Sequence, residues 1–467
     1  MFSQNGFYLN RSAGKTEGIA GRCISRGRLL ASCLVLFVTS GCSSYGVIHN
    51  KPATDIEAGK PYSVKTWAQS EDAADFIFIL NFSGGGTRAA AMAYGVLKEL
   101  RDTPVTIDGQ ERRLLDEVTH ISSVSGGSFT SAYYGLYGER IFDDFENDFL
   151  KKNVQGALTR SLVNPFHWFG RKGRTERSAA YYNKILFHDA TFADMMQPGR
   201  PMIIINASDL AYGVRWSFIQ DYFDLLCSDV REYPVAWAVT ASSAVPVVFN
   251  PIVLKNYPGC PELKASEQVL EMAKNSDELS ELLEGLESYK DKENREFIHF
   301  VDGGITDNMG LRAISDVVAV SGGPAQLMNK NQRKIPSYVV FVSVNASTVK
   351  RPDMNKSTKQ PSILASMNAT TDIQLHRYNA ATIDQVRNNL ENWATQLSTP
   401  EHEVKSYFVE VSFDQVADPQ LKYFLNKVPT AFNLTAEQVD TLIKSAKEML
   451  QADPEYRQLL TDLGKPR

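Results

Sequence analysis

A serine followed by two glycines separates a predicted strand from a predicted helix. Residues 121–131 read Ile-Ser-Ser-Val-Ser-Gly-Gly-Ser-Phe-Thr-Ser, with Ser125 at the centre. The residues before it, 118–124, are rich in β-branched side chains, and residues 129–137 have the small and aromatic side chains of a packed helix. The two glycines after Ser125 permit an abrupt turn between this strand and this helix. The pattern predicts a nucleophile elbow, which holds a serine hydroxyl at the edge of a sheet and over a helix N-terminus.

The elbow pattern departs from the usual G-x-S-x-G at one position. Ser123 stands where the first glycine is expected, and serine is the next smallest choice. The alternative interpretation of this stretch is a Ser/Gly-rich turn without chemistry, because short motifs match by chance.

A second glycine loop joins the first predicted strand to the first predicted helix. Residues 76–80 form a continuous apolar run typical of a strand buried on both faces, and residues 89–100 favour a helix. The loop between them contains Gly84, Gly85 and Gly86. A phosphate-binding loop would need a lysine that is absent, and the dinucleotide pattern would need another glycine. Backbone N–H groups without side-chain obstruction suit an oxyanion hole instead.

An aspartate follows a later predicted strand and is the candidate general base. Residues 297–301 read as a strand, and Asp302 comes directly after it. Ligands of open α/β sheets bind outside the carboxyl ends of the strands, so a base should stand at this position. His120 begins the strand that leads to Ser125, roughly 16 Å away at ~3.3 Å per residue. His299 alternates within its strand and is predicted to pack in the core, and no metal-ligand spacing is present.

The other elements predict an α/β sheet with helices on both faces. Buried strands are expected at 201–206 and 338–344, and an acidic helical insertion at about 262–295. After Pro361 we expect two long helices, a strand near 407–411 and a final helix at 436–450. The predicted organisation is a catalytic domain at 75–350 and a mainly helical C-terminal part at 351–467 packed on it.

The first residues predict export and attachment to a membrane. Three arginines precede an apolar run at 29–38, which is too short to span a bilayer and is typical of a signal peptide. Ser40-Gly41-Cys42 resembles a lipoprotein processing box, so residues 1–41 would be removed and Cys42 would carry acyl chains. Residues 42–74 would then be the lipidated N-terminus and tether. A plain secretory signal with a chance cysteine is the alternative. Ser43 after the cysteine favours the outer membrane by resemblance to other bacterial lipoproteins.

Composition limits the classes of partner. Apolar residues make up 43% of the 467-residue chain, as in globular proteins with a large core. No basic stripe suits nucleic acid. Removal of residues 1–41 takes five basic and one acidic residue and changes the formal net charge from −5 to about −9, so electrostatics would not attract the body to anionic lipid. Cys227 and Cys260 remain, and their spacing leaves a disulfide open.

Four motifs occur in the order found in patatin-like phospholipases, and because of them the chain resembles that family. They are Ser-Gly-Gly-Gly-Thr-Arg at 83–88, Ser-Val-Ser-Gly-Gly at 123–127, Ala-Ser-Ser-Ala-Val-Pro at 241–246 and Asp-Gly-Gly at 302–304. Ser83, Ala89 and Ser123 depart from the family's frequent aspartate, glycine and glycine. The implied fold is a patatin-like three-layer α/β fold, with a mostly parallel central sheet, helices on both faces and an added helical C-terminal part.

The resemblance also implies the roles of the site residues. Ser125 would be the nucleophile of a serine–aspartate dyad without histidine, and Asp302 its general base. The loop from Gly84 to Gly86 would form the oxyanion hole. Arg88, at the basic position after the glycines, would bind substrate. Neither a cofactor nor a metal is expected, and the implied substrates are phospholipids or lysophospholipids.

The sequence leaves two other functions open. One is a Ser-His-Asp carboxylesterase of the ordinary α/β-hydrolase type. The other is an envelope lipoprotein that binds lipid or a partner with an inactive dyad. Residues 164–174 combine aromatic and basic side chains, which suits a bilayer interface, although a core role for the aromatic residues is the alternative.

Overall fold

The computed structural model describes residues 46–53, 62–68, 75–107, 109–163, 173–246, 248–260, 264–349 and 358–464. The unit Gly46–Arg467 is compact. The predicted signal peptide, Cys42 and most of the aromatic and basic segment at 164–174 lie outside the described residues. Among the helices that the structure does describe, none is long and apolar enough for a membrane span.

An eight-stranded sheet forms the centre of the described part of the chain. Its path is β12-β11-β2-β5-β6-β10-β9, and β7 also pairs with β6. The strands are β2 (Phe76–Phe82), β5 (His120–Val124), β6 (Met202–Asp209), β7 (Arg215–Ser217), β9 (Ile252–Lys255), β10 (Phe297–Asp302), β11 (Tyr338–Asn345) and β12 (Lys405–Ser412). From β12 to β6 all neighbours are parallel, whereas β7, β10 and β9 pair antiparallel. Two short ribbons pair β1 (Lys51–Pro52) with β8 (Ser228–Asp229) and β3 (Pro104–Ile107) with β4 (Gln110–Arg113).

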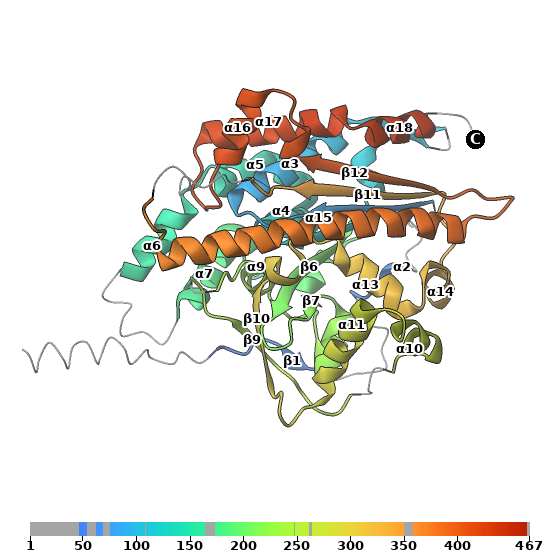
Figure 1. Ribbon diagram of the computed structural model, residues 1–467, viewed down its shortest axis with the longest axis horizontal. Coiled ribbons are helices and arrows are strands. Elements are labelled where there is room, and N and C mark those ends of the chain that lie inside the picture. Colours follow the sequence, from blue (N-terminus) through green and yellow to red (C-terminus); the bar gives the residue numbers. More distant parts are fainter. Residues whose placement is uncertain are drawn as a thin grey trace, which may run out of the picture. The chain divides into compact units, whose positions relative to one another are not determined.

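Helices cover both faces of this sheet. In Figure 1, α15 and α17 lie on opposite sides of β11 and β12. The helices are α2 (Val64–Ala68), α3 (Thr87–Asp102), α4 (Gly126–Tyr137), α5 (Ile141–Phe145), α6 (Val154–Val163), α7 (Arg174–Tyr182), α8 (Gln220–Phe223), α9 (Val235–Ser242), α10 (Glu267–Ala273), α11 (Asp277–Glu287), α12 (Gly304–Asp307), α13 (Arg312–Ser321), α14 (Pro324–Lys330), α15 (Ile363–Leu397), α16 (Pro419–Lys427), α17 (Ala436–Ala452) and α18 (Pro454–Leu463).

Alternation along β2 shows why most of its side chains are apolar. Phe78, Leu80 and Phe82 belong to the core cluster shared with α3, α4 and α17. Ile79, between them, belongs to a second cluster with residues of α15. Successive strand side chains point to opposite faces, so a strand covered on both faces is apolar at most positions. The buried exception in β2 is Asn81, whose Nδ2 donates to the Gly310 carbonyl oxygen.

The edge of β6 brings the ends of two strands together. β7 pairs with Asn206–Ser208 along one edge of β6. Because β5 and β10 also pair with residues of this stretch, they must lie along the opposite edge of β6. On that other edge, β5 pairs up to Asn206 and β10 pairs from Ala207 onward. β5 runs parallel to β6 and β10 runs antiparallel, so their C-terminal ends face each other. The residue after β5 is Ser125, and the last residue of β10 is Asp302.

Several sequence expectations differ from the structure. The region after Pro361 holds one continuous helix of 35 residues, α15, rather than two, and α18 follows the helix that we expected to be last. The prediction that His299 packs in the core is wrong, because its side chain is exposed. Phe297 and His299 are exposed whereas Ile298 and Phe300 are buried, so the face of β10 to which His299 points is uncovered in the first part of the strand.

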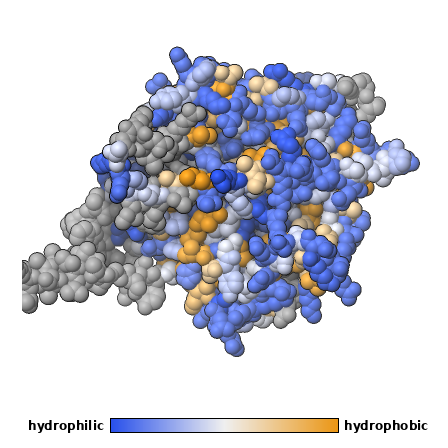
Figure 2. Space-filling model, in the orientation of Figure 1, coloured by the Kyte–Doolittle hydropathy of each residue, from blue (hydrophilic) through white to orange (hydrophobic). Residues whose placement is uncertain are grey.

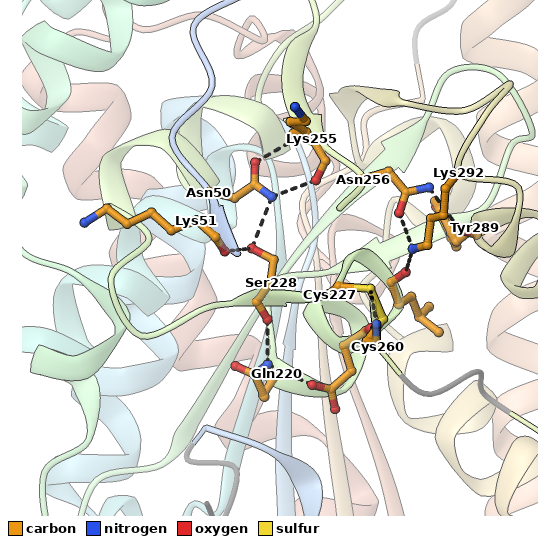
Figure 3. The surroundings of a disulfide bond; sticks show 12 residues. Asn50, Lys51, Gln220, Cys227, Ser228, Lys255, Asn256, Cys260, Tyr289 and Lys292 are labelled. Atoms are coloured by element: carbon orange, nitrogen blue, oxygen red, sulfur yellow. Dashed lines mark hydrogen bonds between the residues drawn. A yellow bond between two sulfur atoms is a disulfide. The ribbon is translucent and has the colours of Figure 1, made fainter. Parts of the chain in front are cut away.

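A disulfide joins the two cysteines that the sequence left open. Cys227 and Cys260 are bonded, with Cα atoms 5.2 Å apart, within the usual range. The N-terminal segment docks beside this bond, because the Ala53 N–H donates to the Cys227 carbonyl oxygen. Figure 3 shows the Asn50 amide between Ser228 and Lys255, and its Nδ2 donates to the Ser228 hydroxyl and to the Lys255 carbonyl. The disulfide therefore stabilises the region that receives residues 50–53.

Candidate active site

The backbone at Ser125 has the conformation of a nucleophile elbow. Its φ is 49° and its ψ is −118°, a region that residues with a side chain rarely occupy. α4 begins at the next residue, Gly126, where a Cβ would lie 2.0 Å from the carbonyl oxygen of Gly86. The glycine is required because the two loops touch through their backbones. This geometry places the Ser125 hydroxyl over the N-terminus of α4.

A second serine holds the elbow in place. The Ser125 N–H donates to Oγ of Ser242 at 2.8 Å, and Oγ of Ser242 is also hydrogen-bonded to Oγ of Ser128 at 2.9 Å. Ser242 ends α9 and belongs to the motif at 241–246, to which sequence analysis gave no role. The motif spacing could have marked this position as part of the site, but only the fold shows what it contacts.

Asp302 contacts the candidate nucleophile directly. The Ser125 hydroxyl donates to Oδ2 of Asp302 at 2.9 Å, and the Gly304 N–H donates to Oδ1 at 2.8 Å. Both residues are only 8% exposed. Burial raises the Asp302 pKa to about 6, although the hydrogen bonds from Gly304 and Ser125 oppose that rise. The carboxylate is therefore a stronger base than an exposed aspartate and still mostly ionised at neutral pH.

The described histidines have other contacts or positions. His120 begins β5, at the opposite end of the strand from Ser125, and its Nδ1 is 3.0 Å from Oγ1 of Thr119. The ring of His49 packs on Trp237. Through Nε2, His376 and His402 donate to carbonyl oxygens of Thr348 and Pro336 respectively, and His188 and His299 are exposed. His167 lies outside the described residues. Among the described residues, the hydrogen bonds of Ser125 and Asp302 involve no histidine.

The three glycines of the first loop differ in how their N–H groups are used. The Gly84 N–H donates to the Asn308 carbonyl oxygen at 2.9 Å. Among the described residues, nothing accepts a hydrogen bond from the N–H of Gly85 or of Gly86. Both have positive φ, 141° and 60°, which glycine adopts without strain. Two N–H groups of the predicted oxyanion hole are thus without an acceptor among the described residues.

A C-terminal segment packs against this glycine loop. The Thr87 N–H donates to the Ala431 carbonyl oxygen at 3.0 Å, and a Cβ on Gly86 would lie 2.8 Å from that same oxygen. Arg88, 3% exposed, donates from Nε to the Ala346 carbonyl and from Nη1 to the Val428 carbonyl, both at 2.7 Å. Arg88 therefore clamps the loop to the end of β11 and to the segment after α16. Its assignment to substrate binding stays a prediction.

Asn308 is a site residue that sequence analysis missed. A Cβ on Gly84 would lie 2.5 Å from its Oδ1, and a Cβ on Gly304 would lie 3.2 Å from the same atom. Its amide thus lies between the glycine loop and the turn that holds Asp302. Asn308 directly follows α12 and is six residues after Asp302. This short separation in the sequence was the one signal that could have placed Asn308 near the aspartate.

Residues 80–314 match the family model described as Patatin-like phospholipase. The chain belongs to the patatin-like phospholipase family. Its predicted α/β fold, a mixed and mostly parallel sheet with many helices, is confirmed. Membership of the family supports lipid acyl hydrolase activity in general. The matched residues include Ser125, Asp302 and the glycine loop, whereas Ala346, Val428 and Ala431 lie beyond them.

Solved structures of human GIVD cytosolic phospholipase A2 are similar to this patatin-like chain. One is 11% identical with a TM-score of 0.46 and covers 86% of this chain and 64% of its own. The complex with methyl gamma-linolenyl fluorophosphonate is 14% identical with a TM-score of 0.38 and covers 86% and 61%. The chain thus spans less than two thirds of the length of these proteins. No curated protein sequence matches it.

Proposed function

We propose that the chain is a serine acyl hydrolase that cleaves fatty-acyl esters of phospholipids or lysophospholipids. The observation that carries the proposal is the 2.9 Å hydrogen bond from the Ser125 hydroxyl to Asp302, a buried carboxylate whose pKa is raised to about 6. A base of this strength beside a serine on an elbow suits nucleophilic catalysis.

The reaction follows from the placement of these groups. Oγ of Ser125 attacks the ester carbonyl carbon while Oδ2 of Asp302 accepts the hydroxyl proton. The N–H groups of Gly85 and Gly86, together with the N-terminus of α4, stabilise the oxyanion of the tetrahedral intermediate. Asp302 then gives its proton to the departing alcohol, which leaves an acyl group on Ser125. Water attacks this acyl-enzyme with Asp302 again as base. As the bond from the acyl carbon to Oγ of Ser125 breaks and the fatty acid leaves, Asp302 returns the proton to Oγ.

The two other functions have less support. A Ser-His-Asp carboxylesterase requires a histidine between the serine and the acid, and the Asp302 carboxyl instead accepts from Ser125 directly. A lipoprotein with an inactive dyad would not need these features in one place. They are the hydrogen bond between Ser125 and Asp302, the strained backbone of Ser125 and two glycine N–H groups without acceptors among the described residues.

The substitution Ser125→Ala tests the proposed function. We expect hydrolysis of short-chain esters and phospholipids to fall to background with little change in the unfolding midpoint, because the hydroxyl contributes to the reaction and little to packing. A fluorophosphonate probe should label the parent at Ser125, as located by mass spectrometry of peptides. Retained hydrolysis in a folded Ser125→Ala protein would exclude Ser125 as nucleophile, and loss on replacing one histidine by alanine would favour the triad.

We infer further that the chain is an outer-membrane lipoprotein attached through acyl chains on Cys42, facing the periplasm or the surface. The processing box supports this location, and a disulfide is typical of an oxidising compartment. Labelled palmitate should enter the parent chain but not Cys42→Ala, and the parent should fractionate with outer membrane. Equal labelling of the two chains would contradict the anchor.

A further inference from the structure

Apolar side chains are exposed in segments that adjoin the catalytic pair. Six of them are between 37% and 56% exposed, and we call them the mouth patch: Val245, Val248, Ile305, Val349, Ile373 and Tyr378. Large apolar side chains gathered on a surface mark interaction sites in soluble proteins more often than scattered ones do.

Two members of the mouth patch are neighbours in sequence of groups that hold Asp302. Ile305 follows Gly304, whose N–H donates to the Asp302 carboxylate. Val245 follows Ala244, whose carbonyl oxygen accepts from the Asp302 N–H at 3.0 Å. These side chains are therefore exposed within a few residues of the general base.

The other side of the patch is linked to the site through α15. Nδ2 of Asn308 and Nδ2 of Asn379 lie 3.4 Å and 3.1 Å from Oγ of Ser347. Nε2 of His376 donates to the Thr348 carbonyl oxygen at 2.8 Å, so the turn before Val349 packs on α15. Figure 2 shows apolar residues in the middle of the face that α15 crosses in Figure 1.

We propose that the mouth patch docks on the surface of a phospholipid bilayer, so that a lipid ester can pass from the bilayer to Ser125. The proposal rests on the proposed function, because a bilayer is where such a substrate is presented. Ser125 is only 8% exposed, so the lipid must move out of the bilayer and into the protein to reach it. Contact between the mouth patch and the bilayer would keep the acyl chain out of water during this transfer. The net negative charge of the body offers no electrostatic attraction, so apolar burial is the source of the body's own affinity, in addition to the acyl chains proposed on Cys42.

A pair of matched double variants tests the docking kinetically. Ile373→Gln with Val349→Gln removes two patch side chains that have no place in the catalytic machinery. Leu270→Gln with Met272→Gln removes two comparably exposed apolar side chains, 48% and 39%, from α10 in the acidic insertion. On phosphatidylcholine vesicles we expect the patch variant to lose about tenfold in kcat/KM, since each apolar group removed weakens adsorption. A soluble short-chain ester should be hydrolysed by both variants as by the parent.

A spectroscopic test does not depend on hydrolysis. In the full chain with Ser125→Ala, Ile373→Trp should show fluorescence quenched by vesicles of brominated phosphatidylcholine, whereas Leu270→Trp should not. Both chains carry the same N-terminus, so any lipid anchor contributes equally. Quenching without hydrolysis in the parent would sustain the docking and reject the proposed function.

Four outcomes would overturn the docking proposal. Equal quenching at positions 373 and 270 is the first. Equal losses on vesicles and on the soluble ester, which indicate damage to the site, are the second. The third is a parent dimer in sedimentation velocity that the patch variant dissociates, which would assign the patch to a second copy of the chain. Adsorption that falls steeply with salt would equally contradict apolar burial as its cause.

Discussion

Oγ of Ser125 lies 2.9 Å from Oδ2 of Asp302 because β5 and β10 end against each other along one edge of β6. Val124 pairs with Asn206, and Asp302 pairs with the next residue of β6, Ala207. A shift of β10 by one residue would turn the Asp302 side chain to the other face of the sheet. The pairing register of β10 is therefore as important to the site as the aspartate itself.

Asp302→Asn should lower turnover of a short-chain ester by about 10²–10⁴-fold, the usual value of general-base assistance. The amide keeps the volume and can still hydrogen-bond to Ser125, but it cannot accept the proton. The parent should show turnover that rises about tenfold per pH unit up to about pH 6 and then levels, because Asp302 must be ionised. Near-parental turnover of a folded Asp302→Asn protein between pH 5 and 9 would remove Asp302 from the mechanism.

The same substitution should change stability in a pH-dependent way. Burial raises the Asp302 pKa from 3.8 to about 6, so the folded state holds a proton that the unfolded state has released between these values. The contribution of Asp302 to the free energy of unfolding is thus full below pH 3.8 and is lost as pH rises through 6.

At pH 8, Asp302→Asn should consequently be more stable than the parent, by on the order of 1–3 kcal/mol. At pH 4 the two proteins should have nearly equal stability. Urea denaturation at both pH values measures the difference, with Ser125→Ala as a control that keeps the carboxylate. A variant that is less stable than the parent at pH 8 would contradict the assigned cost of burying this charge.

Arg88→Lys should lower activity on every ester, whether or not it carries a phosphate. Lysine cannot reproduce the fork that donates to the carbonyl oxygens of Ala346 and Val428, so the glycine loop should lose its fixed position. We expect a lower kcat with a similar KM on a neutral short-chain ester, and a loss of about 1–3 kcal/mol in stability. A loss confined to phospholipids, with an unchanged unfolding midpoint, would instead support direct substrate binding by Arg88.

Loss of the disulfide should reduce stability without affecting chemistry. Cys227 and Cys260 are 33 residues apart, and closing a loop of that length is worth about 3–4 kcal/mol in the chain-entropy account. The double substitution Cys227→Ser with Cys260→Ser should lower the unfolding midpoint, and a reductant should lower that of the parent but not of the variant. Turnover at 25 °C should stay at the parental value. An unchanged midpoint in the double variant would show that the bond constrains little.

Local features were predictable from the sequence by itself. The glycines after Ser125 and in the first loop predict turns because of their own backbone freedom. The apolar run of β2 predicts a strand that is buried on both faces. The acidic insertion was likewise expected to be helical, and α10 and α11 are found there. Each of these properties depends on neighbours within a few positions in the chain.

Other features were decided only by tertiary structure. We placed Asp302 at the carboxyl edge by assuming a parallel strand, and its strand is antiparallel and reaches the site from outside that edge. Ser242 under the elbow, Ala431 against Gly86 and the pairing of Cys227 with Cys260 join residues more than 30 positions apart. Strand direction, pairing register and such contacts depend on which distant surfaces pack together. No local propensity or spacing carries that information, because the free energy that selects among them comes from the assembled core.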